Sequence, residues 1–196
     1  HAVRKSGVCF GANVLIFGAG PIGIMLGLWA RTAGAFRVIL CDIDPTKAEF
    51  ARKQGFDAVN SRETDPVEYI RTQTGGRGAD ACIEGAGVAQ TWEQALKAVK
   101  SFGTVVSMGN PAGDMTLTQK GYWEILRKQL TLKGTWNSSY NDVRNEWRTA
   151  LAAIASHRID VRPLISHRFP LSEADKAFGV MRERKEFFNK VMFINR

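Results

Sequence analysis

A glycine-rich turn between two uncharged segments constrains the fold of this chain more than any other feature. The turn is residues 18–23 (GAGPIG); it follows the apolar run 13–17 and opens the apolar segment 21–33. In the pattern G-x-G-x-x-G, the first glycine permits a tight turn, the second lets another molecule approach the backbone, and the third lets a helix pack closely on a strand. The turn therefore predicts a strand followed at once by a helix, which is how a parallel α/β sheet begins.

The same region has the low charge of a membrane span or a signal peptide. No charged residue lies between Ser6 and Ala30, and Arg4 and Lys5 precede the segment. A helix needs about 20 apolar residues to cross a bilayer. However, the glycine turn lies in the middle, and backbone groups freed by such a turn have no hydrogen-bond partners in lipid. We therefore predict a buried strand and a buried helix, and no membrane partner.

The rest of residues 1–137 alternates short apolar runs with segments of helical periodicity. Asp44-Pro45 and Asp65-Pro66 each predict a helix with Asp as its N-cap and Pro as its first residue. The predicted strands are 13–17, 37–41, 57–59, 81–84, 104–108 and 130–135, and the predicted helices run over 21–33, 44–55, 65–75 and 91–101. This alternation predicts right-handed crossovers and a doubly wound parallel sheet, the Rossmann α/β fold, over residues 1–137.

Residues 138–196 follow a different pattern. They contain predicted helices at 146–156 and 172–184 and two predicted isolated strands at 163–167 and 191–194. So few elements bury little apolar surface by themselves. We therefore interpret them as the C-terminal remainder of a second domain that is incomplete in this chain. The first residue is His1 rather than Met, which we interpret as processing, truncation or a cloned fragment.

The composition excludes several classes of protein. Of the 196 residues, 44% are hydrophobic and 23% charged, which is ordinary for a globular domain and excludes disorder. The formal net charge is +8, but the basic residues are scattered singly, so we expect a solvated surface and no nucleic-acid partner. The three cysteines, at positions 9, 41 and 82, form no C-x-x-C pair, which predicts reduced thiols in a cytoplasmic protein and no structural zinc site.

An acidic residue after the second predicted strand completes a dinucleotide-binding pattern. Asp42 lies nineteen residues beyond Gly23, where a carboxylate can accept both hydroxyls of an adenosine ribose. The helix that begins at Pro21 would present free N–H groups and the positive end of its dipole to a pyrophosphate. A carboxylate also repels a 2′-phosphate, so we expect NAD rather than NADP. The alternatives are an ordinary tight turn for the glycines and helix capping for Asp42 or Asp44.

Other strand ends should border the same crevice, since ligands of such sheets bind at the carboxyl ends of the strands. The segments there are 84–87 (EGAG), 108–110 (MGN) and 134–136 (GTW), whose glycines permit close backbone approach or simply mark turns. Lys47 is a candidate for a ribose or phosphate on the adenine side, although we favour simple solvation. His157 and His167 have no Cys, Asp or Glu partner at metal-ligand spacing, and we interpret Cys82 as a packing residue.

Phrases along the whole chain match a known family. In the first 137 residues they are VLIFGAGPIG (14–23), VILCDIDPTK (38–47), ADACIEGAG (79–87), SFGTVVSMG (101–109) and ILRKQLTLKGTW (125–136). The tail adds PLISHRFPLSEADKAF (163–178) and KVMF (190–193). Together they resemble the zinc-type medium-chain dehydrogenase/reductase family, and in particular its polyol dehydrogenases. Segment 125–136 is most similar to the enzymes that act on sorbitol and galactitol 1-phosphate.

The resemblance implies an activity, a cofactor and a set of binding residues. Members of the family oxidise secondary alcohols of sugars or polyols: a zinc ion acts as a Lewis acid on the alcohol oxygen, and a hydride passes to the nicotinamide of NAD. Carried over by position, the pyrophosphate would be held by Gly18, Gly20, Pro21, Ile22 and Gly23, and the ribose by Asp42. The nicotinamide side would be lined by Gly85, Ala86, Gly109 and Trp136.

The resemblance also implies an assembly and a missing part. The strands at 104–108 and 130–135 would extend a sheet between subunits, giving a homodimer or homotetramer. The family's zinc ligands are a Cys, a Gly-His-Glu segment and a further acid from an N-terminal catalytic domain of roughly 150 residues. This set does not occur here. We therefore expect zinc only in a full-length parent, no catalytic or metal-binding residue in this chain, and cofactor binding without catalysis.

Three other classes of protein share part of this pattern. A zinc-independent quinone reductase of the same superfamily would also lack the ligands, but the polyol-like tail and Asp42 count against it. A non-enzymatic nucleotide-sensing module would not need residues 138–196. An S-adenosylmethionine-dependent methyltransferase carries a glycine loop and an acid, but a third glycine that opens a helix favours a dinucleotide.

Overall fold

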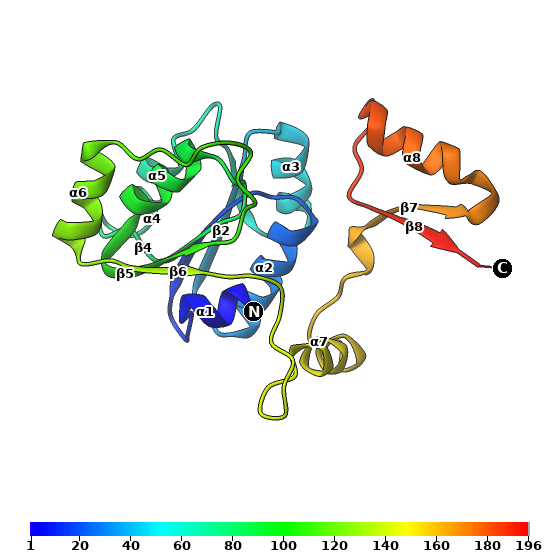
Figure 1. The fold of residues 1–196 in the computed structure, drawn as a ribbon, viewed down its shortest axis with the longest axis horizontal. Coiled ribbons are helices and arrows are strands. Elements are labelled where there is room, and N and C mark those ends of the chain that lie inside the picture. The colour runs from blue at the N-terminus through cyan, green and yellow to red at the C-terminus, as the bar shows by residue number, and fades with distance from the viewer. Residues whose placement is uncertain (196) are drawn as a thin grey trace.

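The computed structural model describes residues 1–195, and its largest element is a six-stranded parallel sheet (Figure 1). The strands are β1 (Asn13–Phe17), β2 (Arg37–Asp42), β3 (Asp57–Asn60), β4 (Ala79–Glu84), β5 (Val99–Ser107) and β6 (Thr131–Gly134). Their order in the sheet is β3-β2-β1-β4-β5-β6, and every neighbouring pair is parallel. The chain thus starts in the middle, builds outward to β3 and then continues from β4 on the other side of β1. This confirms the predicted doubly wound sheet.

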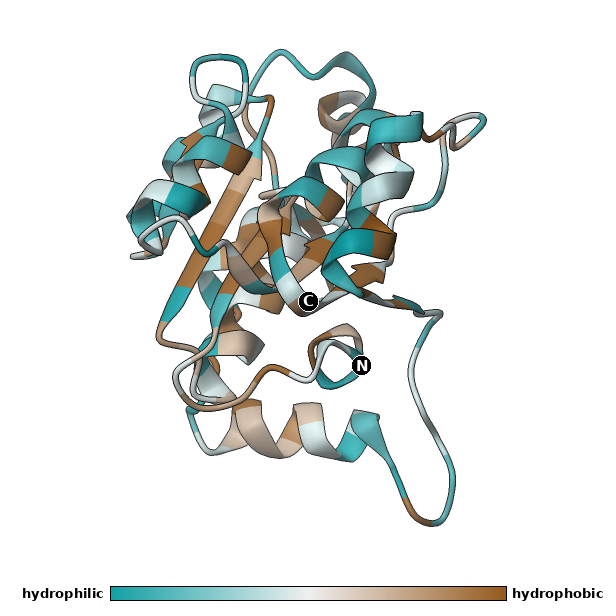
Figure 2. Cartoon of the chain, turned by 90° about the vertical axis from the view of Figure 1, so that its left-hand side faces the viewer, coloured by the Kyte–Doolittle hydropathy of each residue, from teal (hydrophilic) through white to brown (hydrophobic). Residues whose placement is uncertain are grey.

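Different helices cover the two faces of the sheet. They are α1 (Ala2–Ser6), α2 (Pro21–Thr32), α3 (Pro45–Lys53), α4 (Pro66–Gln73), α5 (Ala89–Ala98) and α6 (Gln119–Lys128). In β1, Val14 and Ile16 point into a core shared with α2 and α3, whereas Leu15 and Phe17 point into a core shared with α4 and α5. Because successive side chains of a strand alternate between faces, a strand covered on both sides is apolar throughout. Figure 2 shows these hydrophobic strands inside a layer of more hydrophilic helices.

The two Asp-Pro helix starts are confirmed. The Asp44 side chain accepts a hydrogen bond from the N–H of Thr46 at 2.9 Å, and the Asp65 side chain accepts one from the N–H of Val67 at 2.8 Å. Each aspartate precedes a proline in the first turn of its helix. These bonds satisfy N–H groups that have no partner within the helix.

Two helices lie outside the sequence pattern. α1 has only five residues, too few to show a helical period. α6 is amphipathic, but most of its apolar side chains are exposed and only Gly121 is fully buried. α6 begins after Thr118, whose side chain accepts from the N–H of Gly121 at 3.0 Å. Within residues 1–195, no helix has the length and apolar content needed to cross a membrane.

The predicted helix 91–101 is wrong at both ends. α5 covers Ala89–Ala98, and residues 99–101 already belong to β5. Val99 pairs with Ala79 of β4, and the Lys100 ammonium lies 2.5 Å from the Asp80 carboxylate. These contacts with β4 end the helix, and no local periodicity could have revealed them.

The tail forms a second, smaller unit beside the sheet (Figure 1). Its elements are α7 (Glu146–Ala155), the 3-10 turn η1 (Arg162–Leu164), β7 (Ile165–Pro170), the 3-10 turn η2 (Leu171–Glu173), α8 (Ala174–Glu183) and β8 (Lys190–Ile194). β7 and β8 pair in parallel, with α8 between them in sequence, so the prediction of two isolated strands is wrong. The predicted strand 163–167 also starts too early, because Pro163 lies in the 3-10 turn.

A few contacts join the tail to the sheet unit. The Glu146 carboxylate lies 2.9 Å from Nδ1 of His1 and accepts a hydrogen bond from Arg4 at 2.7 Å. Phe187 packs on Phe50 of α3, with ring centroids 5.1 Å apart. The division of the chain at residue 137 stays a prediction.

Candidate cofactor site

The glycine turn between β1 and α2 uses its three glycines in different ways. Gly18 has a φ of +106°, a conformation that residues with a side chain rarely adopt. At Gly23, a Cβ would lie 2.0 Å from the carbonyl oxygen of Gly18, so only glycine lets α2 approach the turn this closely. At Gly20, a Cβ would meet no atom within 4 Å. The fold therefore requires the first and third glycines, whereas the second leaves open space at the start of α2.

The N-terminus of α2 lacks a capping side chain. Its N-cap is Gly20, Pro21 follows in the first turn, and Ile22 is exposed beside them. By contrast, α3 and α4 are capped by the side chains of Asp44 and Asp65. N–H groups at a helix start and the positive end of the dipole attract anions. This open N-terminus next to a bare glycine fits a pyrophosphate, which would be held by Gly18, Gly20, Pro21, Ile22 and Gly23.

Asp42 lies at the end of β2, directly beside the turn. Its Oδ2 accepts a hydrogen bond from the N–H of Ala19 at 2.9 Å, and its Oδ1 accepts one from the N–H of Asp44 at 3.0 Å. The side chain is half-exposed. Each carboxylate oxygen has further acceptor capacity, so a diol could still bind. Of the two aspartates for which helix capping was an alternative, Asp44 is the cap of α3, and Asp42 orients the glycine turn.

The next residues of α3 stabilise the Asp44 carboxylate. Partial burial by itself would raise the pKa of Asp44, but the hydrogen bonds from the hydroxyl and the N–H of Thr46 and the charge of Lys47 outweigh it, so the pKa is below its usual value. Lys47 is half-buried in the first turn of α3, and none of the ion pairs within residues 1–195 includes it. Its role toward a cofactor stays a prediction.

The ends of β1, β4 and β5 lie side by side. The N–H of Gly85 donates to the carbonyl of Phe17 at 3.0 Å, and the N–H groups of Met108 and Gly109 both donate to the carbonyl of Glu84 at 2.9 Å. A Cβ on Gly109 would lie 2.3 Å from the backbone nitrogen of Gly87. The structure therefore brings Gly85, Ala86 and Gly109 to one edge, next to the glycine turn.

Glu84 is a residue of this edge that the sequence did not single out for a role. Its side chain is 1% exposed, and its Oε1 accepts three hydrogen bonds of 2.8 Å each, from the N–H of Ala86, the N–H of Gly87 and the hydroxyl of Thr91. A glutamate directly after the apolar, buried run 81–83 is the signal that could have identified it.

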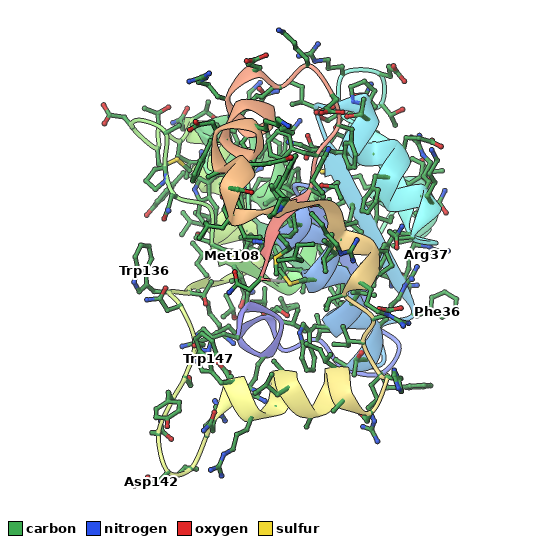
Figure 3. All side chains as sticks on the ribbon, turned by 90° about the vertical axis from the view of Figure 1, so that its right-hand side faces the viewer. Phe36, Arg37, Met108, Trp136, Asp142 and Trp147 are labelled. Carbon is green, nitrogen blue, oxygen red and sulfur yellow. The ribbon has the colours of Figure 1, made fainter. Side chains whose placement is uncertain are left out.

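A cavity of about 320 Å³ opens at the carboxyl ends of β5 and β6. Its lining includes Ile22, Leu26, Met108, Asn110 and Trp136. Trp136 is 70% exposed; Figure 3 shows it at the margin of the domain, with Met108 further inside. The size is at the lower end of the range for small-molecule sites. The cavity thus joins the start of α2 to the strand ends predicted to line the nicotinamide side.

The described residues do not fit a zinc ion. Within residues 1–195, no three His, Cys, Asp or Glu side chains come together in a way that could hold a metal. His167 has one carboxylate neighbour that its sequence spacing did not reveal, since its Nε2 lies 3.7 Å from Glu186. Cys41 and Cys82 are buried in the sheet, and burial raises the pKa of both thiols, which disfavours the thiolate that binds metals.

Known proteins match this chain both in sequence and in structure. An erythritol/L-threitol dehydrogenase of Mycolicibacterium smegmatis is 32% identical over 189 residues, which cover 95% of this chain and 50% of that protein. The crystal structure of galactitol-1-phosphate dehydrogenase from Escherichia coli matches with a TM-score of 0.88 and 30% identity, over 100% of this chain and 57% of that one. The chain spans about half the length of the curated relatives it matches.

A further structural neighbour was solved with a cofactor. It is a zinc-binding dehydrogenase from Sinorhizobium meliloti 1021 bound to NADP, with a TM-score of 0.85 and 32% identity over 100% of this chain and 56% of that one. The family model described as zinc-binding dehydrogenase matches residues 21–156, from the start of α2 to the end of α7, which is more than half of the chain. Helix α2, Asp42 and strands β2 to β6 all lie within the residues that this model matches, and the chain belongs to the zinc-binding dehydrogenase family.

Proposed function

We propose that this chain binds NAD and is the cofactor-binding portion of a polyol dehydrogenase. The observation that carries the proposal is the open N-terminus of α2, with bare Gly20 as its N-cap and the Asp42 carboxylate beside it. The turn would hold the pyrophosphate, and the strand ends at Gly85, Ala86 and Gly109 would border the nicotinamide, with Trp136 at the rim of the cavity.

Asp42 favours NAD over NADP. Its carboxylate would accept the ribose hydroxyls while keeping its bonds to Ala19 and Asp44, and its charge would repel a 2′-phosphate. Lys47, in the first turn of α3, is the candidate cation for the adenine side. The Sinorhizobium meliloti relative bound to NADP makes this preference the part of the proposal that most needs a direct test.

The reaction that we propose is the oxidation of a secondary alcohol of a sugar alcohol, with transfer of a hydride to NAD. Relatives named for erythritol, L-threitol, sorbitol and galactitol 1-phosphate support this substrate class. Zinc, bound elsewhere in a full-length parent, would supply the Lewis acid. This chain contributes the hold on the cofactor; by itself we expect it to bind NAD without catalysis. No observation favours a quinone reductase or a nucleotide-sensing module.

The remaining features of the proposal concern organisation. Residues 1–137 would be the cofactor domain, and 138–196 the remainder of the catalytic domain. Strand β6 is an edge of the sheet with exposed Leu132, and we propose that subunits associate through it as a homodimer or homotetramer. Cys9, Cys41 and Cys82 are all free thiols, which suits a cytoplasmic protein.

Calorimetric titration of the 196-residue chain with NAD and NADP tests the cofactor. We expect NAD to bind at least ten times more tightly, a difference of about 1.4 kcal/mol. Asp42→Ala should weaken NAD binding about ten-fold and strengthen NADP binding, because only NAD uses the carboxylate and the 2′-phosphate of NADP is no longer repelled. Equal affinities in the unsubstituted chain, or an unchanged NAD affinity in Asp42→Ala, would contradict the proposal. Glu68→Ala, on the exposed face of α4, is the matched control, for which we expect no change.

A further inference from the structure

Glu84 carries a buried negative charge that has no cationic partner. The side chain is 1% exposed, and none of the ion pairs within residues 1–195 includes it. Three donors converge on its Oε1: two backbone N–H groups of the β4–α5 turn and the hydroxyl of Thr91. This is the acceptor pattern of an ionised carboxylate. A buried charge without a cation is costly, so hydrogen bonds and a helix dipole must compensate for it.

Capping alone does not require that charge. α5 has ten residues, and its N-cap, Val88, has no side chain that can accept a hydrogen bond. From the preceding strand, Glu84 accepts hydrogen bonds from two N–H groups of the turn before the helix and from the Thr91 hydroxyl. However, neutral side chains cap the starts of α6 and α7, where the side chains of Thr118 and Asn145 each accept a hydrogen bond from a first-turn N–H group. A glutamine would therefore serve as a hydrogen-bond acceptor at position 84, and the negative charge needs a separate reason.

The backbone of Glu84 is hydrogen-bonded to a residue that lines the cavity. Its carbonyl accepts from the N–H groups of both Met108 and Gly109, and Met108 lines the cavity together with Asn110. The carboxylate of the same residue accepts hydrogen bonds from the N–H groups of Ala86 and Gly87. The charge is thus one hydrogen bond from Ala86, which we assign to the nicotinamide side, and the backbone of the same residue is hydrogen-bonded to the end of β5.

We propose that the Glu84 carboxylate biases this site toward the oxidised nicotinamide ring. The inference rests on the proposed function, since it requires a nicotinamide dinucleotide as the ligand. The oxidised ring carries a positive charge and the reduced ring is neutral, whereas the rest of the two molecules is identical. A fixed anion in a region of low dielectric attracts the cationic ring and leaves the affinity for the neutral ring nearly unchanged. Glu84 touches only the protein, so it is a positioning residue with an electrostatic effect.

The test compares two cofactors on two variants. Dissociation constants of NAD⁺ and NADH are measured by calorimetry for the unsubstituted chain and for Glu84→Gln, which keeps the size and the acceptor oxygen but removes the charge. We expect Glu84→Gln to weaken NAD⁺ binding about five-fold more than NADH binding. A purely structural role would change both affinities by the same factor, and that result would overturn the proposal.

A second variant keeps the test decisive if Glu84→Gln does not fold, as judged by circular dichroism. Thr91→Val removes one donor from Oε1 and keeps the charge, which then acts with less compensation. We expect the dissociation constant of NADH divided by that of NAD⁺ to rise about two-fold. An unchanged ratio would overturn the inference. If the unsubstituted chain binds neither cofactor, the proposed function itself fails. If it binds both and neither variant changes the ratio, only the role of Glu84 is refuted.

Discussion

The β1–α2 and β4–α5 turns have the same topology, and neither helix has a side-chain cap, but the chemistry of the two turns differs. In both, a buried parallel strand leads through glycines into a helix on the same edge of the sheet. At the start of α2, Gly20 leaves the helix without a side-chain cap. In the β4–α5 turn, the Glu84 carboxylate accepts hydrogen bonds from the N–H groups of Ala86 and Gly87.

This difference shows that two turns at equivalent places in one sheet can have different roles. A helix start attracts anions in either case, because its N–H groups and its dipole are properties of the backbone. In the β4–α5 turn, the Glu84 carboxylate satisfies two N–H groups of the turn. In the β1–α2 turn, Asp42 satisfies only the N–H of Ala19 and leaves the start of α2 free for an external anion. We therefore assign the anion-binding site to the β1–α2 turn and a structural role to the β4–α5 turn.

The largest expected effect comes from filling the open turn at its third glycine. Gly23→Val would place a Cβ 2.0 Å from the backbone oxygen of Gly18, which cannot move without displacing β1. We expect the free energy of unfolding to fall by about 3 kcal/mol, measured by urea denaturation. Gly20→Ala is the matched control, since its Cβ would meet nothing: stability should fall by less than about 1 kcal/mol. Equal losses of stability in the two variants would show that the glycines do not have the separate roles assigned here.

The next effect comes from opening the occupied turn. Glu84→Ala leaves the N–H groups of Ala86 and Gly87 without their acceptor and creates a small cavity, so we expect a loss of about 2 kcal/mol in the free energy of unfolding. Urea denaturation again provides the measurement. Glu68→Ala removes an exposed glutamate from α4 and should cost less than about 0.5 kcal/mol. A loss no larger than that of the control would mean that water replaces the carboxylate at little cost.

The smallest effect concerns a capped helix, whose stabilisation by the Asp44 carboxylate should be lost in acid. The pKa of Asp44 in the folded chain is below its usual value, so its stabilising contribution is present above the unfolded pKa of about 4 and is lost as the pH falls through the lower, folded pKa. Asp44→Ala should lower stability at pH 7 by about 1 kcal/mol, and Asp44→Asn by less, because Asn also caps helices. Thermal melts between pH 7 and pH 3 should show a weaker acid dependence in both variants; an unchanged dependence would assign the acid sensitivity to other carboxylates.

Local signals allowed much of the fold and the site to be predicted. The Asp-Pro pairs place the starts of α3 and α4 correctly because capping acts within three residues. The apolar runs place β1 and β2 because both faces of a parallel sheet are buried. The glycine spacing marks the turn because Gly18 and Gly23 meet conformational and steric demands that only glycine satisfies.

Features that depend on distant partners could not be predicted in this way. Residues 99–101 look helical but are held in β5 by Ala79 and Asp80 of β4. The strands of the tail look isolated, yet β7 and β8 pair with each other. Glu84 looks like an ordinary polar strand end until the turn and α5 close over it.

The sequence by itself thus determined the order of strands and helices and the position of the open glycine turn, because both follow from interactions between residues close together in the chain. The tertiary structure alone decided that the Glu84 carboxylate satisfies N–H groups of the β4–α5 turn, because that depends on where a strand end points once the sheet has formed. For the same reason, only the tertiary structure distinguishes Glu84 from the other charged residues, as a buried carboxylate hydrogen-bonded to the turn before α5.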